Sequence, residues 1–125
     1  MEKAKSGHYY LKTRISPKER ELFFAAARDM DVPYYLLMRH LVRYALQSET
    51  DWPELLKRLN ADSENPEREE TKVNMRTQIP PELYAAFANF AEKWGSNVNT
   101  VMRKLILLYI ASTIERHVII EPLTL

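Results

Sequence analysis

The chain contains no cysteine, so disulfide bonds and thiolate metal sites are excluded. Its two glycines form no glycine-rich phosphate loop. The longest apolar run, residues 105–111, is too short to cross a bilayer, and residues 1–7 lack the apolar stretch of a secretory signal. His8, His40 and His117 lack metal-ligand spacing, and no nucleophile–base or carboxylate pair is recognisable. We therefore expect a cytoplasmic protein without a cofactor, a membrane partner or catalytic activity.

A large net charge is also lacking, because the 18 basic and 17 acidic residues nearly cancel. The charge is nevertheless divided along the chain. Residues 1–48 hold nine Lys/Arg against five Asp/Glu, residues 49–71 hold three against eight, and residues 72–125 hold six against four. Two mildly basic lobes are thus joined by an acidic connector. This division fits either an ordinary solvated linker or lobes that meet a polyanion while the connector stays away from it.

The sequence repeats itself, because residues 9–48 align with residues 73–112 at a constant offset of 64 without a gap. Each copy begins with a strand pattern, reaches a proline and continues as two helical stretches. A unit of about 40 residues cannot bury its apolar face alone, so the copies are interpreted as two halves of one core. The identical pairs are Thr13/Thr77, Ile15/Ile79, Pro17/Pro81, Phe23/Phe87, Ala27/Ala91, Met38/Met102, Arg39/Arg103, Leu41/Leu105 and Ser48/Ser112.

The composition predicts five segments. They are a basic N-terminal arm (1–7), a first repeat (8–48), an acidic connector with a short amphipathic helix (49–71), a second repeat (72–116) and a C-terminal tail (117–125). The apolar stripe of the connector, within residues 52–59, is expected to dock on the chain's own core. Docking of a partner protein is the alternative for this stripe and for the tail.

In the first repeat a strand is predicted over residues 8–15. Ser16, Pro17 and Glu19 then form the signature of a capping box that opens a helix. A break at residues 31–33 precedes a second helix, 34–47. The expected inward residues are Phe23, Ala26, Ala27 and Met30 on the first helix and Leu37, Met38, Leu41, Val42 and Ala45 on the second.

The second repeat follows the same plan after its strand. A helix starts at Pro80-Pro81-Glu82, and Gly95-Ser96 ends it. Asn97 is expected to cap the last helix, which is predicted over residues 98–115. The expected inward residues of the earlier helix are Leu83, Ala86, Phe87, Phe90, Ala91 and Trp94.

Each predicted strand has one nearly apolar face and one polar face, because side chains alternate along a strand. If the strands pair antiparallel with their apolar faces on the helices, the polar faces form one outward patch. A two-stranded ribbon fits the major groove of DNA, where Arg or Lys reads guanine and Asn or Gln reads adenine. The outward residues, expected to contact bases, are Tyr10, Lys12, Arg14, Asn74, Arg76 and Gln78.

At these residues the chain resembles the ribbon-helix-helix (Arc/MetJ-type) family of DNA-binding proteins. The second copy carries most of the resemblance, through the segments 75–82 and 91–100, and residues 32–39 carry it in the first. The resemblance implies a mainly α fold with a short two-stranded antiparallel β-ribbon, arranged as a tandem pseudo-dimer. It also implies that alternate strand residues read bases, while the start of each second helix holds a DNA phosphate, as a helix N-terminus can.

The phosphate contacts that we expect are His8, Lys72, Tyr34, Tyr35, Asn97, Val98 and Asn99. Pro33 lacks the N–H group available at Asn97, which predicts a weaker first contact. The strand residues differ between the copies, so the expected DNA site is asymmetric. Arg39 and Arg103 recur at one repeat position, either as exposed helix charges, as partners of a nearby acidic residue or as DNA-backbone contacts. Pairing of the repeats within one chain or between chains is left open by the sequence.

The expected function is therefore sequence-specific binding of double-stranded DNA. Tandem members of the family resemble repressors and the relaxosome accessory proteins of conjugative plasmids. We accordingly expect a transcriptional regulator or a plasmid-transfer accessory factor, able to form homo-oligomers on adjacent sites. The alternative is an antitoxin-like interaction module that binds a protein partner through residues 49–60 or 117–125. A third reading, a helical assembly protein, predicts no salt-sensitive DNA binding.

Overall fold

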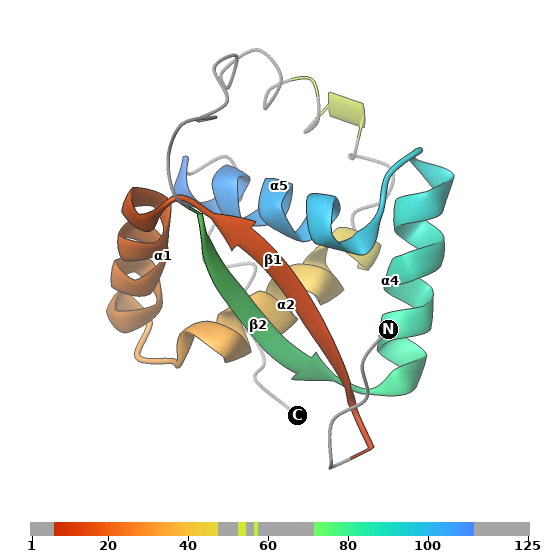
Figure 1. The fold of residues 1–125 in the computed structure, drawn as a ribbon, viewed down its shortest axis with the longest axis horizontal. Coiled ribbons are helices and arrows are strands. Elements are labelled where there is room, and N and C mark those ends of the chain that lie inside the picture. Colours follow the sequence, from red (N-terminus) through yellow and green to blue (C-terminus); the bar gives the residue numbers. More distant parts are fainter. Residues whose placement is uncertain (1–6, 48–52, 55–56, 58–71, 112–125) are drawn as a thin grey trace.

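The computed structural model describes residues 7–47, 53–54, 57 and 72–111. These residues form a mainly helical fold with one two-stranded antiparallel sheet. In Figure 1 the sheet crosses the front of the molecule, α2 and α5 lie behind it, and α1 and α4 stand at its two ends. The elements are β1 (Tyr9–Ile15), α1 (Pro17–Asp29), α2 (Tyr34–Gln47), β2 (Val73–Ile79), α4 (Pro81–Lys93) and α5 (Val98–Ile110).

The sheet, called the ribbon below, pairs β1 with β2 of the same chain. Lys12 lies opposite Arg76, and these two residues occupy the same position in the two sequence repeats. The register is therefore centred on this pair. Tyr10 opposite Gln78 on one side of it corresponds, through the offset of 64, to Asn74 opposite Arg14 on the other. In this structure the two strands that the sequence predicts therefore pair within one chain.

The inner face of the ribbon is buried as the alternation predicts. Leu11, Ile15, Met75 and Ile79 are at most 1% exposed and join the core formed by the helices. β1 packs mainly against α5 and β2 mainly against α2, so each strand rests on the second helix of the other repeat. This crossed packing explains why neither repeat has a core of its own.

The capping box predicted at the start of α1 is confirmed. The side-chain oxygen of Ser16 accepts a hydrogen bond from the Glu19 N–H (3.1 Å), and the Glu19 carboxylate accepts one from the Ser16 N–H (3.0 Å). The predicted break before α2 is also confirmed. It contains Asp31 at a φ of 60°, in the left-handed region that most side chains avoid. These signals set the two ends of α1.

The predicted core of α2 is confirmed, because Leu37, Met38, Leu41, Val42 and Ala45 are all 0% exposed. On α1, Phe23, Ala26 and Ala27 are buried, and the half-buried Met30 accepts a hydrogen bond from the buried Tyr109 hydroxyl, at 2.6 Å.

The expectation for Ala86 was wrong, because this residue is exposed. The buried face of α4 centres on Phe87, Phe90 and Ala91, with Leu83 and Trp94 half-buried. At about 100° per residue, Ala86 lies about 90° around the helix from that centre. Leu22, its equivalent in α1, is exposed as well.

Several predicted segments lie outside the described residues. They are most of the arm (1–6), all of the connector except residues 53–54 and 57, and the tail. Residues 53–54 and 57 are helical, within the stretch where a short helix was predicted. α5 ends at Ile110 with Ala111 as its C-cap, so the part of its predicted extent beyond residue 111 is likewise outside.

Candidate nucleic-acid interface

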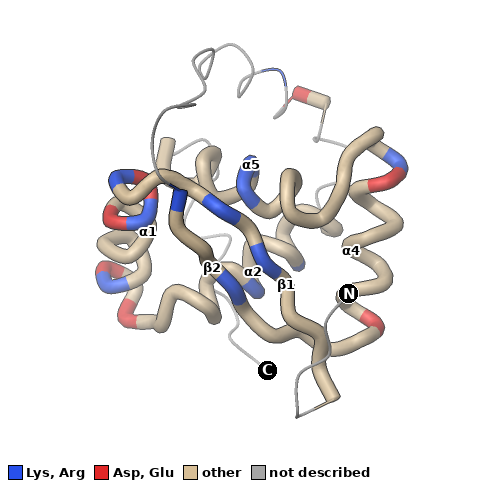
Figure 2. Tube along the Cα trace, in the orientation of Figure 1, with Lys and Arg blue, Asp and Glu red and all other residues tan. Residues whose placement is uncertain are grey.

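The outward face of the ribbon carries the six residues predicted to contact bases, arranged as three cross-strand pairs. Lys12–Arg76 forms the centre, Tyr10–Gln78 lies toward one end and Arg14–Asn74 toward the other. Lys12, Arg14, Asn74 and Arg76 are exposed, whereas Tyr10 and Gln78 are half-buried. Figure 2 shows basic positions along both strands and no acidic ones. The face therefore joins cations, amides and one aromatic ring on a single surface.

Two buried threonines tie the ribbon to the starts of the second helices. The hydroxyl of Thr13 on β1 donates a 2.7 Å hydrogen bond to the carbonyl oxygen of Asn99 on α5. The hydroxyl of Thr77 on β2 donates one of the same length to the carbonyl oxygen of Tyr35 on α2. The two bonds are related by the offset of 64. Each strand thus holds the helix start of the other repeat beside the outward face.

The two helix starts differ in how their N–H groups are capped. The Asn97 side-chain oxygen accepts a hydrogen bond from the Thr100 N–H (2.9 Å), which confirms Asn97 as the cap of α5. At α2 the carbonyl oxygen of Pro33 accepts hydrogen bonds from the Leu36 and Leu37 N–H groups. At both starts the first helical N–H groups have no preceding turn to donate to, and the helix dipole favours an anion there.

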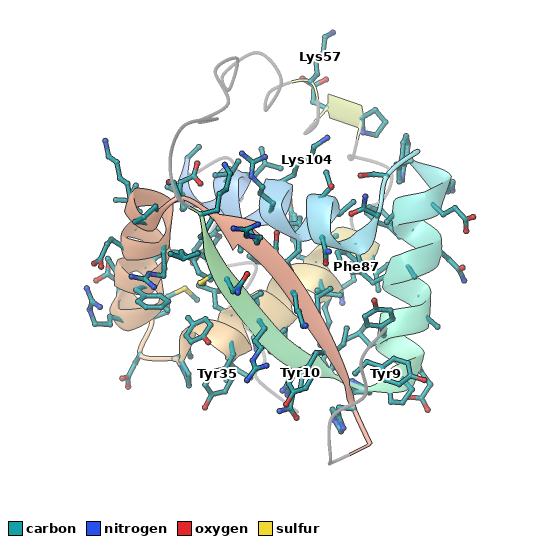
Figure 3. The ribbon with its side chains drawn as sticks, viewed as in Figure 1. Tyr9, Tyr10, Tyr35, Lys57, Phe87 and Lys104 are labelled. Carbon is teal, nitrogen blue, oxygen red and sulfur yellow. The ribbon has the colours of Figure 1, made fainter. Side chains whose placement is uncertain are left out.

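A hollow of about 400 Å³ lies where the start of α2 meets β2. We call it the tyrosine hollow, since Tyr10, Tyr34 and Tyr35 are among its lining residues; Tyr10 and Tyr35 are labelled in Figure 3. Tyr34 packs edge-on against Tyr35, with ring centroids 5.6 Å apart. The other lining residues are Arg39, Arg76, Thr77 and Gln78.

A second hollow of about 290 Å³ lies at the start of α5 and is called the asparagine hollow. It is lined by Lys12, Thr13, Arg14, Asn74, Asn99, Thr100 and Arg103. Six of these seven positions are the repeat equivalents of residues in the tyrosine hollow. The two hollows thus have matching positions but different chemistry, because Tyr10 and Tyr35 in one are replaced by Asn74 and Asn99 in the other.

Arg39 and Arg103 belong to this surface, one in each hollow. Both are half-buried, and the Nε atom of each is buried without a hydrogen-bond partner among the described residues. Burial and the nearby Arg43 lower the pKa of Arg39, while Tyr35 acts in the opposite direction. An arginine stays charged through such a change. The sequence signal was the recurrence of arginine at one repeat position, which could not distinguish this site from an exposed helix charge.

The other predicted phosphate contacts lie at the edges of the same surface. His8 directly precedes β1 and Lys72 directly precedes β2, so they lie at opposite ends of the antiparallel ribbon. Tyr34 opens α2, while Val98 and Asn99 open α5. No residue that lines either hollow is acidic. The surface therefore offers a cationic centre flanked by two helix starts.

Within the described part of the chain, no group of three or more His, Asp or Glu residues could hold a metal ion. No helix among these residues is long and apolar enough to span a membrane. Comparison with known proteins finds no matching family model, no matching curated protein and no matching solved structure.

Proposed function

We propose that this protein binds double-stranded DNA in a sequence-specific manner by inserting the ribbon into the major groove. The observation that carries the proposal is the set of three outward cross-strand pairs, with Lys12–Arg76 at its centre. Strands of one sheet lie about 4.8 Å apart, and the groove is about 12 Å wide. A two-stranded ribbon with its side chains therefore fits it.

The side-chain types on the ribbon match the groove edges of the bases. Lys12, Arg14 and Arg76 suit the O6 and N7 acceptors of guanine, and Asn74 and Gln78 suit adenine N6 and N7. In this reading, bases set the sequence preference and phosphates set the position and most of the affinity. Opposite ends of the ribbon carry different pairs, so the proposed site is not palindromic.

The hollows beside the ribbon are the proposed phosphate-binding positions. Each combines a helix start, hydrogen-bond donors and one arginine from the second helix, Arg39 or Arg103, beside an arginine of the ribbon. Tyr34, Tyr35, Asn97, Val98 and Asn99 supply the helix-start contacts, and His8 and Lys72 supply contacts at the ribbon ends. A DNA strand on either side of the occupied groove would pass one hollow.

The same observations support a tandem ribbon-helix-helix pseudo-dimer. The register is centred on two repeat-equivalent residues, Lys12 and Arg76. The hydrogen bonds of Thr13 and Thr77 are also repeat equivalents. One chain would then do what two copies do in most members of the family. Its role would be transcriptional regulation in the cytoplasm, or assistance in plasmid transfer, with further copies on adjacent sites.

The test is selection of duplex fragments from a random DNA library by the purified full chain, followed by sequencing of the retained pool. We expect an enriched motif that is not a palindrome. An unenriched pool would contradict base reading by the strands. A partner-binding role would instead give a protein complex that survives alteration of the ribbon but not deletion of residues 49–71 or 117–125.

A single substitution sharpens the test. Replacing Arg76 by Ala should weaken binding to the selected site by about 1–3 kcal/mol and relax the preference at one base position. The measurement is a titration of the site and its single-base variants against both proteins. Equal weakening on every sequence would argue that Arg76 contacts the DNA backbone instead. Arg28→Ala, an exposed change on α1, is the control and should leave the preference unchanged.

A further inference from the structure

The Arg76 guanidinium does not extend freely from the ribbon but lies over the ring of Tyr10. Its Cζ atom is 4.6 Å from the ring centroid, within the range of about 6 Å for a cation–π contact. Tyr10 lies opposite Gln78, and Arg76 is two residues from Gln78 on the same face. The contact is therefore a diagonal cross-strand contact, which aromatic and long side chains can make.

The repeat-equivalent diagonal on the other side of the ribbon is different. There Asn74 takes the place of Tyr10, and Lys12 takes the place of Arg76. An amide presents no aromatic face to a cation. The two central cations face each other across the ribbon but have different neighbours. Arg76 lies over an aromatic ring, whereas the equivalent neighbour of Lys12 is an amide.

We propose that Tyr10 is a positioning residue that sets DNA specificity through Arg76. This inference rests on the proposed function. Bidentate recognition of guanine requires the planar guanidinium fork to approach the O6 and N7 atoms in one orientation. A ring that holds the fork before binding lowers the cost of ordering a long side chain in the complex. Tyr10 thus acts on a base through Arg76, not as the direct base contact that the strand pattern suggested.

The arrangement also makes the two central base positions of the proposed DNA site unequal. The guanine read by the pre-ordered Arg76 is discriminated more strongly than the base that faces Lys12. Tyr10 and Arg76 both line the tyrosine hollow, together with Tyr34 and Tyr35 from the start of α2. Strong base reading and the tyrosine hollow therefore belong to the same half of the surface.

A double-mutant cycle tests the proposal. The quantity measured is the affinity for the selected site divided by that for the site with its Arg76-dependent base changed. Tyr10→Leu should lower this ratio about two- to tenfold, whereas Tyr10→Phe, which keeps the ring, should retain it. In an Arg76→Ala background, Tyr10→Leu should have no further effect. Asn74→Leu is the equivalent change in the second repeat. It should lower the affinity for the selected site by the same factor in the wild-type and the Arg76→Ala backgrounds.

Two results would overturn the proposal. If Tyr10→Leu lowers the affinity ratio by the same factor with and without Arg76→Ala, Tyr10 contacts a base itself. If Tyr10→Phe lowers the ratio as much as Tyr10→Leu does, the hydroxyl and not the ring is the important group. The Arg76 Nε–H resonance of the free protein gives a DNA-independent readout. It should shift when the Tyr10 ring is removed and stay in place in Tyr10→Phe. An unshifted resonance refutes the contact between Arg76 and Tyr10 and leaves the proposed function in place. A wild-type protein without a sequence preference refutes the proposed function and this inference with it.

Discussion

At the scale of single residues, Arg39 and Arg103 extend the candidate surface beyond the ribbon. Their positions on α2 and α5 place one arginine in each hollow, behind the helix start that borders it. A half-buried guanidinium keeps its charge and loses part of its hydration, so it attracts an anion more strongly than a fully exposed one. These two residues are accordingly expected to contribute to affinity and not to sequence preference.

Replacing either arginine by Ala should weaken binding by a similar factor on selected and random DNA. The physical reason is that a phosphate contact carries no base information. The dependence of log K on log salt should become shallower by about one unit for each arginine removed. Titrations at several salt concentrations measure this slope. A changed base preference, or an unchanged slope, would count against the assignment; Arg28→Ala is again the control.

His40 on α2 and its repeat equivalent on α5 differ in chemistry. Its side chain is 6% exposed, and its Nε2 atom has no hydrogen-bond partner among the described residues. Burial, together with Arg43 and Arg39, lowers the pKa of His40 below the ordinary value of 6.5. Its repeat equivalent, Lys104, is only half-buried. The folded protein therefore favours neutral His40.

This lowered pKa predicts that acid destabilises the fold. The unfolded chain binds the proton more readily, so stability is complete above the unfolded pKa, near 6.5, and falls as the pH drops toward the folded pKa. Urea unfolding of the wild type and of His40→Leu at pH 7.5 and pH 5.5 measures the effect. The wild type should lose more stability between the two pH values than the variant. Equal losses would show that His40 does not titrate on unfolding.

At the scale of elements, the threonine hydrogen bonds join the ribbon to the helices that flank it. Thr13 and Thr77 are each 3% exposed and donate to carbonyl oxygens in the first turn of α5 and α2. Because each bond runs from one repeat to the other, it fixes the distance between the outward strand residues and the opposite helix start. A surface that contacts bases and phosphates together needs that distance to be constant.

Replacing Thr13 or Thr77 by Val keeps the shape of the side chain but removes the donor. Each change should lower the free energy of unfolding by about 1 kcal/mol. It should also weaken binding to the selected DNA site, because the affected helix start is held less firmly. Chemical unfolding and DNA titration provide the two measurements. Thr→Ser at the same positions keeps the hydroxyl and should retain most of both properties; a serine variant as weak as the valine variant would contradict the argument.

At the scale of the whole molecule, one chain supplies both strands of the ribbon and both second helices. A dimer of identical subunits would present the same residues to both halves of its DNA site. Here the two halves are separate segments of one chain, so Tyr10, Lys12 and Arg14 differ from their repeat equivalents Asn74, Arg76 and Gln78. The molecule thus combines a strand register centred on repeat-equivalent residues with unequal chemistry on its two sides.

Making the two strands alike should make the DNA site symmetric. In the variant Tyr10→Asn, Lys12→Arg, Arg14→Gln, the outward residues of β1 equal those of β2. Library selection with this variant should return a palindromic motif, in place of the asymmetric motif expected for the wild type. The three positions are on the outer face, so the core is unchanged. Chemical unfolding shows whether the variant is folded. If it is folded and its motif is still asymmetric, the two strands do not read DNA in equivalent ways.

The local structure of the chain follows from its residue pattern alone. The period of the apolar residues specified two strands and the helices that follow, and Ser16, Pro17, Asn97 and Gly95 marked ends that the structure has. These features depend on neighbours within a few residues, where capping, backbone conformation and side-chain alternation act. The same pattern separated the inner from the outer face of each strand before any pairing was known.

Which distant residues meet is a property of the tertiary structure. It paired the strands within one chain, set Lys12 opposite Arg76, laid Arg76 over Tyr10 and brought Arg39 and Arg103 to the ribbon. It also left Ala86 exposed at the edge of a helical stripe. Register and side-chain neighbours depend on packing between segments that lie far apart in the sequence, which periodicity does not encode. The candidate site therefore needed the fold, although most of its residues could be found without it.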